Sequence, residues 1–218
     1  MPIPTRVSSD KPKTAKERIF LEVRDWIITG TLQPGEKISD QEISKYFSVS
    51  RTPVREAIQM LADHRLVDIH PGRETRVSPV NFDESAPNYR IMAELHALIL
   101  EFAYPHISTD VINELRDIDQ AFTVAVKRRN VQDAAAFDRK FHDVLAKLAG
   151  NHFLTEFTSV LGSHIQRIEN MFYQKNNFVA FNAHGDIIDA LVQHDLTKAK
   201  EAMRQNWLRA SENLKKVR

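Results

Sequence analysis

The segment from Ile38 to Val77 constrains the fold most, because it combines a short helix, a turn, a basic helix and a hairpin in immediate succession. In its middle, Val54, Ile58 and Leu61 recur at helical spacing after Ser50, and serine is a favoured residue at the start of a helix. The other faces of this helix carry hydroxyl and guanidinium groups. The segment therefore predicts a small helical module whose central helix begins with exposed polar and basic side chains.

Two further helices are predicted before this basic helix. Apolar side chains recur at helical spacing and stop at Gly30, a suitable residue just past a helix end. They are Ile19, Val23, Trp26 and Ile27. Ser39 and Glu42 have the spacing of a capping box, which predicts a short second helix through Tyr46.

A hairpin is predicted after the basic helix. Apolar and polar residues alternate over 67–70, the chain turns at Pro71-Gly72 and resumes over 75–77, and Pro79 then interrupts any regular pattern. We expect four parts: a flexible tail over residues 1–13, a winged helix-turn-helix domain over 14–78, a linker over 79–82, and a helical domain over 83–218.

The second half of the chain predicts helices only. Apolar ladders recur at helical spacing, and one of them consists of Val111, Leu115, Ile118 and Phe122. Ser108 and Thr197 have the character of N-caps, and Gly150 follows the end of a ladder. The predicted fold is therefore mostly α, with the winged helix-turn-helix followed by an all-α antiparallel bundle of six or seven helices.

Composition limits the classes of function. The 218 residues have a formal net charge of +1, which excludes a histone-like basic protein, so DNA binding needs local clustering of cationic side chains. Arg51, Arg55, Arg73 and Arg76 supply such a cluster. The absence of cysteine excludes disulfides, thiolate metal sites and cysteine nucleophiles. Residues 1–13 lack the apolar core of a signal peptide or membrane anchor, so we expect a cytoplasmic protein without a membrane partner.

The start of the basic helix carries side chains suited to duplex DNA. An α-helix fits the major groove, and its N-terminal residues approach the base edges, where we place Ser50, Arg51, Thr52 and Arg55. An arginine that binds guanine in a bidentate manner contributes roughly 1–3 kcal/mol of discrimination. The wing tip at Gly72-Arg73 would reach the minor groove or phosphates. The alternative is that these arginines only solvate a surface helix.

A second constellation lies in the helical half. Asp138 and His142 stand four residues apart on one predicted helix, and His184 and Asn206 fall on apolar ladders that turn them inward. The ladder of His184 includes Phe181, Ile188 and Leu191. An inward carboxylate needs a partner, and nitrogen and oxygen ligands without sulfur suit zinc, nickel, manganese or iron. The alternative is a helix-face pair of Asp138 and His142 beside a hydrogen-bonded core histidine.

The N-terminal half resembles the GntR regulators in its winged helix-turn-helix. The similarity covers Thr14 to Val77 and rests on Pro34-Gly35, Glu42-Ile43 and the run Ser50-Arg51-Thr52-Pro53-Val54-Arg55-Glu56-Ala57. It implies that Ser50, Arg51, Thr52 and Arg55 contact operator DNA and that Gly72 enters the minor groove. Gln41 stands where well-known relatives have an arginine that touches DNA, so this contact differs here.

The helical half, from about Phe82 to Leu214, resembles the FCD effector domain of the FadR subfamily. In that domain an aspartate, a histidine four residues later and two further histidines bind a metal, which implies a site at Asp138, His142 and His184, with Asn206 in the place of the last histidine. Family members commonly bind small carboxylates at this metal. Arg90, which matches a recurrent family arginine, and Arg167 are candidates to complete the charge match.

Together these features predict a ligand-responsive regulator, most simply a repressor, that binds a pseudo-palindromic operator as a homodimer and is released by a small organic acid. One alternative is a metal-dependent enzyme with a DNA-binding appendage, which would need a general base near the metal, and we find no second carboxylate at helical spacing to the cluster. Another is an architectural protein that binds operator and random duplex with similar affinity.

Overall fold

The computed structural model describes residues 14–70, 74–81, 85–176 and 184–216. The chain divides into two compact units, Met1–Pro79 and Val80–Arg218, and each has its own hydrophobic core. No helix in the described ranges has both the length and the apolar character needed to cross a membrane.

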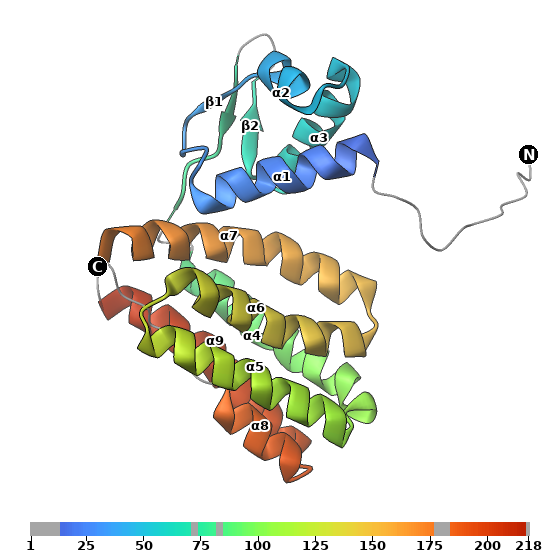
Figure 1. The fold of residues 1–218 in the computed structure, drawn as a ribbon, viewed down its shortest axis with the longest axis vertical. Helices are drawn as coiled ribbons and strands as arrows, with labels where there is room; N and C mark the ends of the chain where they lie inside the picture. Colours follow the sequence, from blue (N-terminus) through green and yellow to red (C-terminus); the bar gives the residue numbers. More distant parts are fainter. Residues whose placement is uncertain (1–13, 71–73, 82–84, 177–183, 217–218) are drawn as a thin grey trace, which may run out of the picture. The chain divides into compact units, whose positions relative to one another are not determined.

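The first unit has the elements expected of a winged helix-turn-helix (Figure 1). Over the described residues these are α1 (Ala15–Thr29), β1 (Lys37–Ile38), α2 (Asp40–Phe47), α3 (Arg51–Asp63), β2 (Val67–Ile69) and β3 (Thr75–Val77). Thr14 and Glu17 form a capping box at the start of α1, and Gly30 ends this helix with a left-handed φ of 79°. The predicted first helix is therefore confirmed.

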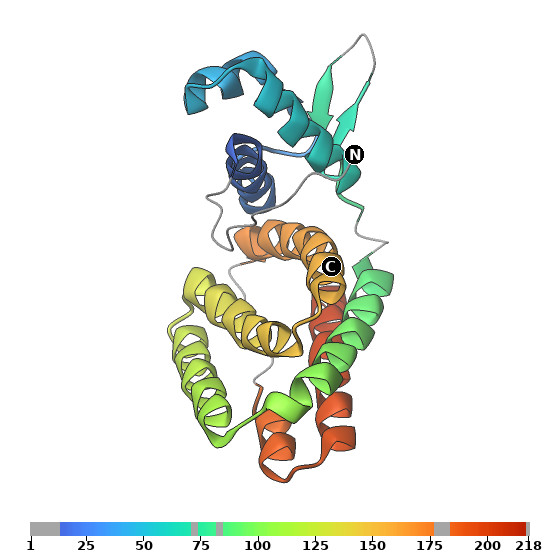
Figure 2. The same cartoon turned by 90° about the vertical axis from the view of Figure 1, so that its right-hand side faces the viewer.

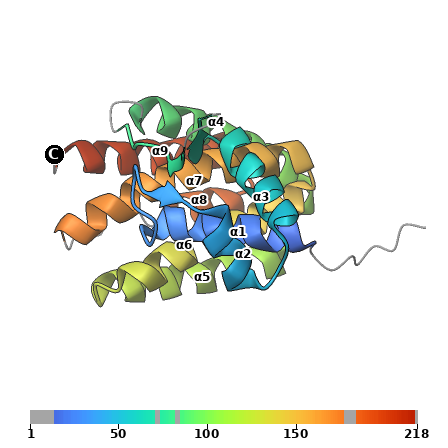
Figure 3. The same ribbon diagram turned by 90° about the horizontal axis from the view of Figure 1, so that it is seen from above.

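The helix-turn-helix forms because a tight turn connects α2 to α3 and both helices pack on the same hydrophobic core. The Ser39 hydroxyl accepts a hydrogen bond from the backbone N–H of Glu42 and caps α2, as predicted. Ser48 adopts a left-handed φ of 54°, which turns the chain towards α3. The buried face of α3 packs against α1 and α2, and Figure 3 shows these three helices together from above. This face consists of Val54, Ala57, Ile58 and Leu61.

The sheet has three antiparallel strands in the order β1-β3-β2. The predicted hairpin is confirmed, since Val67 pairs with Val77 and Ile69 with Thr75. Sequence patterning missed β1, because a strand of two residues is too short to show alternation. It forms because Lys37 and Ile38 pair with the free edge of β3.

The second unit consists of helices in its described residues, which confirms the predicted all-α bundle. They are α4 (Ser85–Ala103), the 3-10 turn η2 (Tyr104–His106), α5 (Thr109–Lys127), α6 (Val131–Ala149), α7 (His152–Asn176), α8 (Gly185–Val192) and α9 (Leu196–Lys216). The predicted N-cap at Ser108 is confirmed, because its hydroxyl accepts from the Val111 N–H. The one predicted at Thr197 is wrong: the Asp195 carboxylate accepts from the Lys198 N–H, so α9 begins before Thr197.

Helix α4 is central to the second unit. It packs against α6, α7 and α9, while α5 packs against α6 and α8, and Figure 2 shows α4 and α9 side by side. Fully buried side chains from α4, α5, α6, α8 and α9 fill the main core. Among them are Leu100, Leu115, Phe141, Leu145, Ala190 and Met203.

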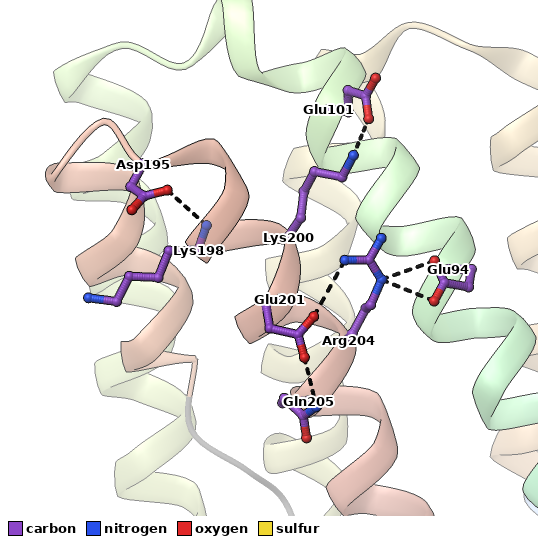
Figure 4. A network of polar contacts seen from close by, with 8 residues as sticks. All are labelled: Glu94, Glu101, Asp195, Lys198, Lys200, Glu201, Arg204 and Gln205. Atoms are coloured by element: carbon purple, nitrogen blue, oxygen red, sulfur yellow. Dashed lines mark hydrogen bonds and ion pairs between the residues drawn. The ribbon is translucent and has the colours of Figure 1, made fainter.

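Polar contacts link α9 to α4 (Figure 4). The Arg204 Nε donates to both carboxylate oxygens of Glu94 at 3.0 Å, and Lys200 pairs with Glu101 one turn away. Partly exposed ion pairs of this kind add little stability, so the buried side chains that α4 and α9 contribute to the core hold the two helices together. The contact between α4 and α9 matters because α4 carries His96 and α9 carries Trp207, and both rings lie beside that of His142.

Candidate functional site

The first turns of α3 present polar and basic side chains to solvent. Ser50 occupies the N-cap position, but its side chain makes no capping hydrogen bond in the described part of the chain. Arg51, Thr52 and Arg55 follow and are exposed. Pro53 fits at this place because the N–H groups of a first turn lack intrahelical partners. The surface thus offers hydroxyl and guanidinium donors at the end of a helix.

The two arginines are held by one carboxylate that sequence reasoning did not single out. Asp40 is the first residue of α2, and its oxygens accept from Arg51 Nη2 at 2.7 Å and from Arg55 Nε at 3.0 Å. The hydrogen bond from Arg51, with that from Arg55, holds the pKa of Asp40 below its usual value. Their side chains remain 54% and 68% exposed, so this arrangement orients the guanidinium groups without covering them.

The remaining predicted DNA-binding residues come from α2 and from the stretch of sequence between β2 and β3. Gln41 is exposed beside Asp40 on α2. Gly72 and Arg73 lie outside the described residues. Arg76, which was counted in the arginine cluster, donates to the Gly35 carbonyl oxygen at 2.7 Å and pairs with Glu74. The Arg76 side chain remains 48% exposed despite these contacts.

In the second unit, the fold brings together three of the predicted metal ligands. Asp138 and His142 on α6 and His184 before α8 offer ligand atoms that all lie within 4.8 Å of one another. His142 is 6% exposed and His184 is fully buried, whereas Asp138 is partly buried. Spacing along α6 placed the first two on one face, and tertiary packing added the third.

His184 reaches the cluster for a different reason from the one predicted. It stands at the N-cap of α8 rather than within a helical ladder, and Phe181, the earliest member of that ladder, lies outside the described residues. Asp119 on α5 holds it, accepting from the His184 backbone N–H at 2.9 Å and lying 3.0 Å from Nδ1. The imidazole also stacks on Phe141, with ring centroids 3.9 Å apart. These contacts leave Nε2 directed to Asp138 at 3.2 Å.

The other candidates in this unit occupy distinct environments. Asn206 is 9% exposed on α9, immediately before Trp207. Arg167 on α7 is 3% exposed, in keeping with an inward direction. Arg90 on α4 is exposed next to the fully buried Tyr89. Of the two arginines, Arg167 is thus the one buried within the bundle.

Four residues that lie near the candidate metal ligands were not predicted from the sequence as part of the site. Asp119 supports His184, and His96 on α4 lies with its ring centroid 4.6 Å from that of His142. Trp207 contacts both His96 and His142. Glu169 on α7 accepts a hydrogen bond from the Tyr89 hydroxyl at 2.6 Å. Each comes from a helix other than α6, so no local spacing connects it with Asp138 and His142.

Burial and charge shift the pKa values of this cluster in opposite directions. Burial lowers the pKa of His96 to about 3 and, together with the nearby His96, lowers that of His142 well below its usual value. Burial alone would also lower the pKa of His184, but hydrogen bonds to Asp119 and Asp138 raise it to about 9. In the metal-free protein a proton on His184 therefore links the two carboxylates.

Burial raises the pKa of Glu169 to about 7, with a further contribution from Asp138. The unfolded chain ionises this group above its ordinary value of 4.5, while the folded chain keeps the proton up to about pH 7. Stability is therefore lost as the pH rises through this window and stays lost above it. We expect Glu169→Gln to increase the free energy of unfolding at pH 8 by on the order of 2 kcal/mol.

Urea unfolding of chelator-treated protein at pH 5 and pH 8 measures this effect. The gain from Glu169→Gln should be small at pH 5 and large at pH 8, and the exposed Glu156→Gln on the same helix is the control. An equal gain at both pH values would contradict the assignment of the proton to Glu169.

The donor set fits a divalent metal ion. One carboxylate and two imidazoles are common ligands of zinc and related ions, and ligating histidines usually donate their other N–H to a carboxylate or carbonyl oxygen. Asp119 occupies this supporting position for His184. A metal would replace the proton on His184 and balance the charge of Asp138, so the residues present suit such an ion.

Comparison with known proteins identifies both units. Residues 15–77 match the family of bacterial regulatory proteins named gntR, and residues 88–208 match the FCD domain. The HTH-type transcriptional repressor RspR of Escherichia coli K12 is 24% identical over 220 residues, which cover 100% of this chain and 96% of that protein. An uncharacterized HTH-type regulator from an unstable DNA locus of Streptomyces ambofaciens is 27% identical over 210 residues, covering 94% and 87% of the two chains.

A solved structure supports the fold. Escherichia coli McbR/YncC superposes with a TM-score of 0.80 at 17% identity, over 94% of this chain and 99% of that one. The family and the curated relatives are transcription regulators, which confirms the expectation of a regulator rather than an enzyme. With a helix-turn-helix match in one unit and an FCD match over more than half of its length, the chain belongs to the GntR family of bacterial regulatory proteins that carry an FCD effector domain.

Proposed function

We propose that this transcription regulator binds a pseudo-palindromic operator as a homodimer, with α3 of each protomer in a major groove. The observation that carries the proposal is the exposed row of Arg51, Thr52 and Arg55 at the start of α3. One helix of this kind reads a half-site, and a two-fold dimer presents two of them one helical turn of DNA apart. Gln41, Ser50 and the wing residues Gly72 and Arg73 complete the proposed contacts.

In this proposal the second unit senses a small carboxylate. A divalent ion at Asp138, His142 and His184, with Asn206 as a further candidate ligand, supplies a positive charge in a buried place, and Arg167 offers a second one. When bound, such an ion attracts and orients a carboxylate. A repressor released by this acid requires that the acid bind the DNA-free state more tightly than the DNA-bound state.

Selection of bound sequences from a random duplex library, followed by footprinting and light scattering, tests the DNA part of the proposal. Two protected half-sites separated by about ten base pairs and a dimeric mass support it. Equal affinity for the selected duplex and random duplex at one salt concentration would instead favour an architectural protein.

The contact with Asp40 makes a separate prediction. Fixing two flexible arginines in advance avoids roughly 0.5–1.5 kcal/mol of ordering cost for each side chain on binding. We expect Asp40→Asn to lower the ratio of selected-site affinity to random-duplex affinity by about tenfold. The affinity for random duplex should itself rise, because the substitution removes a negative charge near the phosphates.

Fluorescence anisotropy titrations of both duplexes at fixed salt measure this ratio. Asp63→Asn, at the far end of α3, removes the same charge away from the arginines and serves as the control. A ratio that stays at the parent value in Asp40→Asn would show that the carboxylate does not prepare the arginines for DNA.

A further inference from the structure

Three buried nitrogen atoms beside the candidate metal ligands have no hydrogen-bond partner among the described residues. They are Nδ1 of His96, Nδ1 of His142 and Nε1 of Trp207. His96 is 5% exposed and His142 is 6% exposed, so solvent does not satisfy these groups. A buried polar group without a partner is unfavourable, and folded proteins rarely tolerate several in one place.

The three rings that carry these nitrogen atoms lie side by side. The ring centroid of His96 lies 4.6 Å from that of His142 and 4.9 Å from that of Trp207, and His142 and Trp207 are 5.0 Å apart. The three rings come from α4, α6 and α9. Packing of these helices thus places His96, His142 and Trp207 at the corners of a triangle. Glu94 and Arg204 form an ion pair between the same two helices, α4 and α9 (Figure 4).

The chemistry of the triangle selects its ligand. An indole N–H can only donate a hydrogen bond, so the partner of Trp207 must be an acceptor. Each imidazole offers a further N–H or a lone pair. His142 is shared between the triangle and the proposed metal ligands, so any group bound here lies close to the ion.

We propose that His96 and Trp207, beside His142, form a second subsite of the effector site, which binds an oxygen acceptor of the effector other than the carboxylate at the metal. This inference rests on the proposed carboxylate-sensing function and specifies it further. The effector is then a short acid with two oxygen functions, a hydroxy or keto acid or a dicarboxylate. A monofunctional acid fills only the metal subsite.

The indole resonances of the full-length, zinc-loaded protein test this directly. The chain has two tryptophans, Trp26 in the first unit and Trp207, and Trp207→Phe assigns their signals in protein labelled with ¹⁵N at tryptophan. We expect glycolate, malonate or both to shift the Trp207 indole N–H, while acetate leaves it in place. The Trp26 signal is the internal control.

Calorimetry with the same acids gives the energetic test. Trp207→Phe keeps an aromatic ring but removes the N–H donor, so it should weaken binding of malonate, whose second oxygen function is charged, about tenfold or more. His96→Ala should have a similar effect, and acetate affinity and zinc content should stay the same in both variants. Thermal unfolding of each variant checks that the bundle remains folded.

The outcomes separate this inference from the function on which it rests. The bifunctional acids could bind while the Trp207 signal stays in place and the variants keep the parent's affinity. That result would contradict the subsite but not the carboxylate-sensing proposal, and buried water would then be the partner of the three nitrogen atoms. Loss of zinc in His96→Ala would make His96 a metal ligand and overturn the subsite as well. If none of the acids binds the zinc-loaded protein, both the carboxylate-sensing proposal and the subsite fail.

Discussion

Replacing Arg51 and Arg55 together by alanine is expected to weaken binding to the selected operator by about 30-fold or more. Each arginine that contacts a base contributes roughly 1–3 kcal/mol of discrimination, and two such losses together reach at least about 2 kcal/mol. The change also leaves the Asp40 carboxylate without its two partners, and in the proposed complex this carboxylate then lies close to the DNA phosphates. The repulsion that results adds to the loss.

Anisotropy titrations with the operator and with random duplex at several salt concentrations measure this effect. Arg18→Ala, an exposed arginine on α1, removes a positive charge from the same unit without touching α3 and should change affinity little. Because both replaced arginines are exposed, circular dichroism of the double variant should match the parent. Parental affinity in the double variant would refute the assignment of α3 as the DNA-reading helix.

Replacing His142 and His184 together by alanine is expected to abolish stoichiometric metal binding. Two of the three clustered ligands are lost, and a single carboxylate does not retain a divalent ion against dialysis. The parent protein should hold about one ion per chain. At a metal concentration about a hundred times Kd, the parent's Tm should rise by roughly 5 to 10 °C, and the variant's should not.

Elemental analysis after dialysis and thermal unfolding with and without zinc measure the two effects. His106→Ala combined with His152→Ala removes two exposed histidines of the same unit and is the matched control. Because His184 is fully buried, Asp138→Asn provides a second variant that changes the side chain's shape little. If both variants still carry one ion per chain, the metal lies elsewhere in the protein.

Local patterns predicted the helices well because helix formation depends on neighbours in the sequence. The spacing of Val54, Ile58 and Leu61 gave the buried face of α3, and Ser39 gave the start of α2. The spacing of Asp138 and His142 placed both on one face of α6 before any tertiary contact was known. The main error in capping, at Thr197, arose because Asp195 lies two residues earlier and competes for the same role.

Residues that act through long-range contacts left no such pattern. The Asp119 carboxylate supports His184 across 65 residues of sequence, and Asp40 reaches Arg55 across 15. His184 was predicted inward on a helical ladder, yet it is buried because Asp119 and Phe141 hold it at the N-cap of α8. The sequence predicted that His184 is buried, but it did not predict the contacts that hold it there.

The sequence by itself therefore determined the order of the helices, the wing, the residues at the exposed start of α3 and the two candidate metal ligands on α6. These follow from periodicity, capping and turn chemistry, which act over a few residues. Only the tertiary structure decided that Asp40 holds both arginines, that Asp119 turns His184 towards Asp138, and that His96 and Trp207 stand beside His142. Such contacts arise when whole helices pack, and packing is governed by surfaces far apart along the chain.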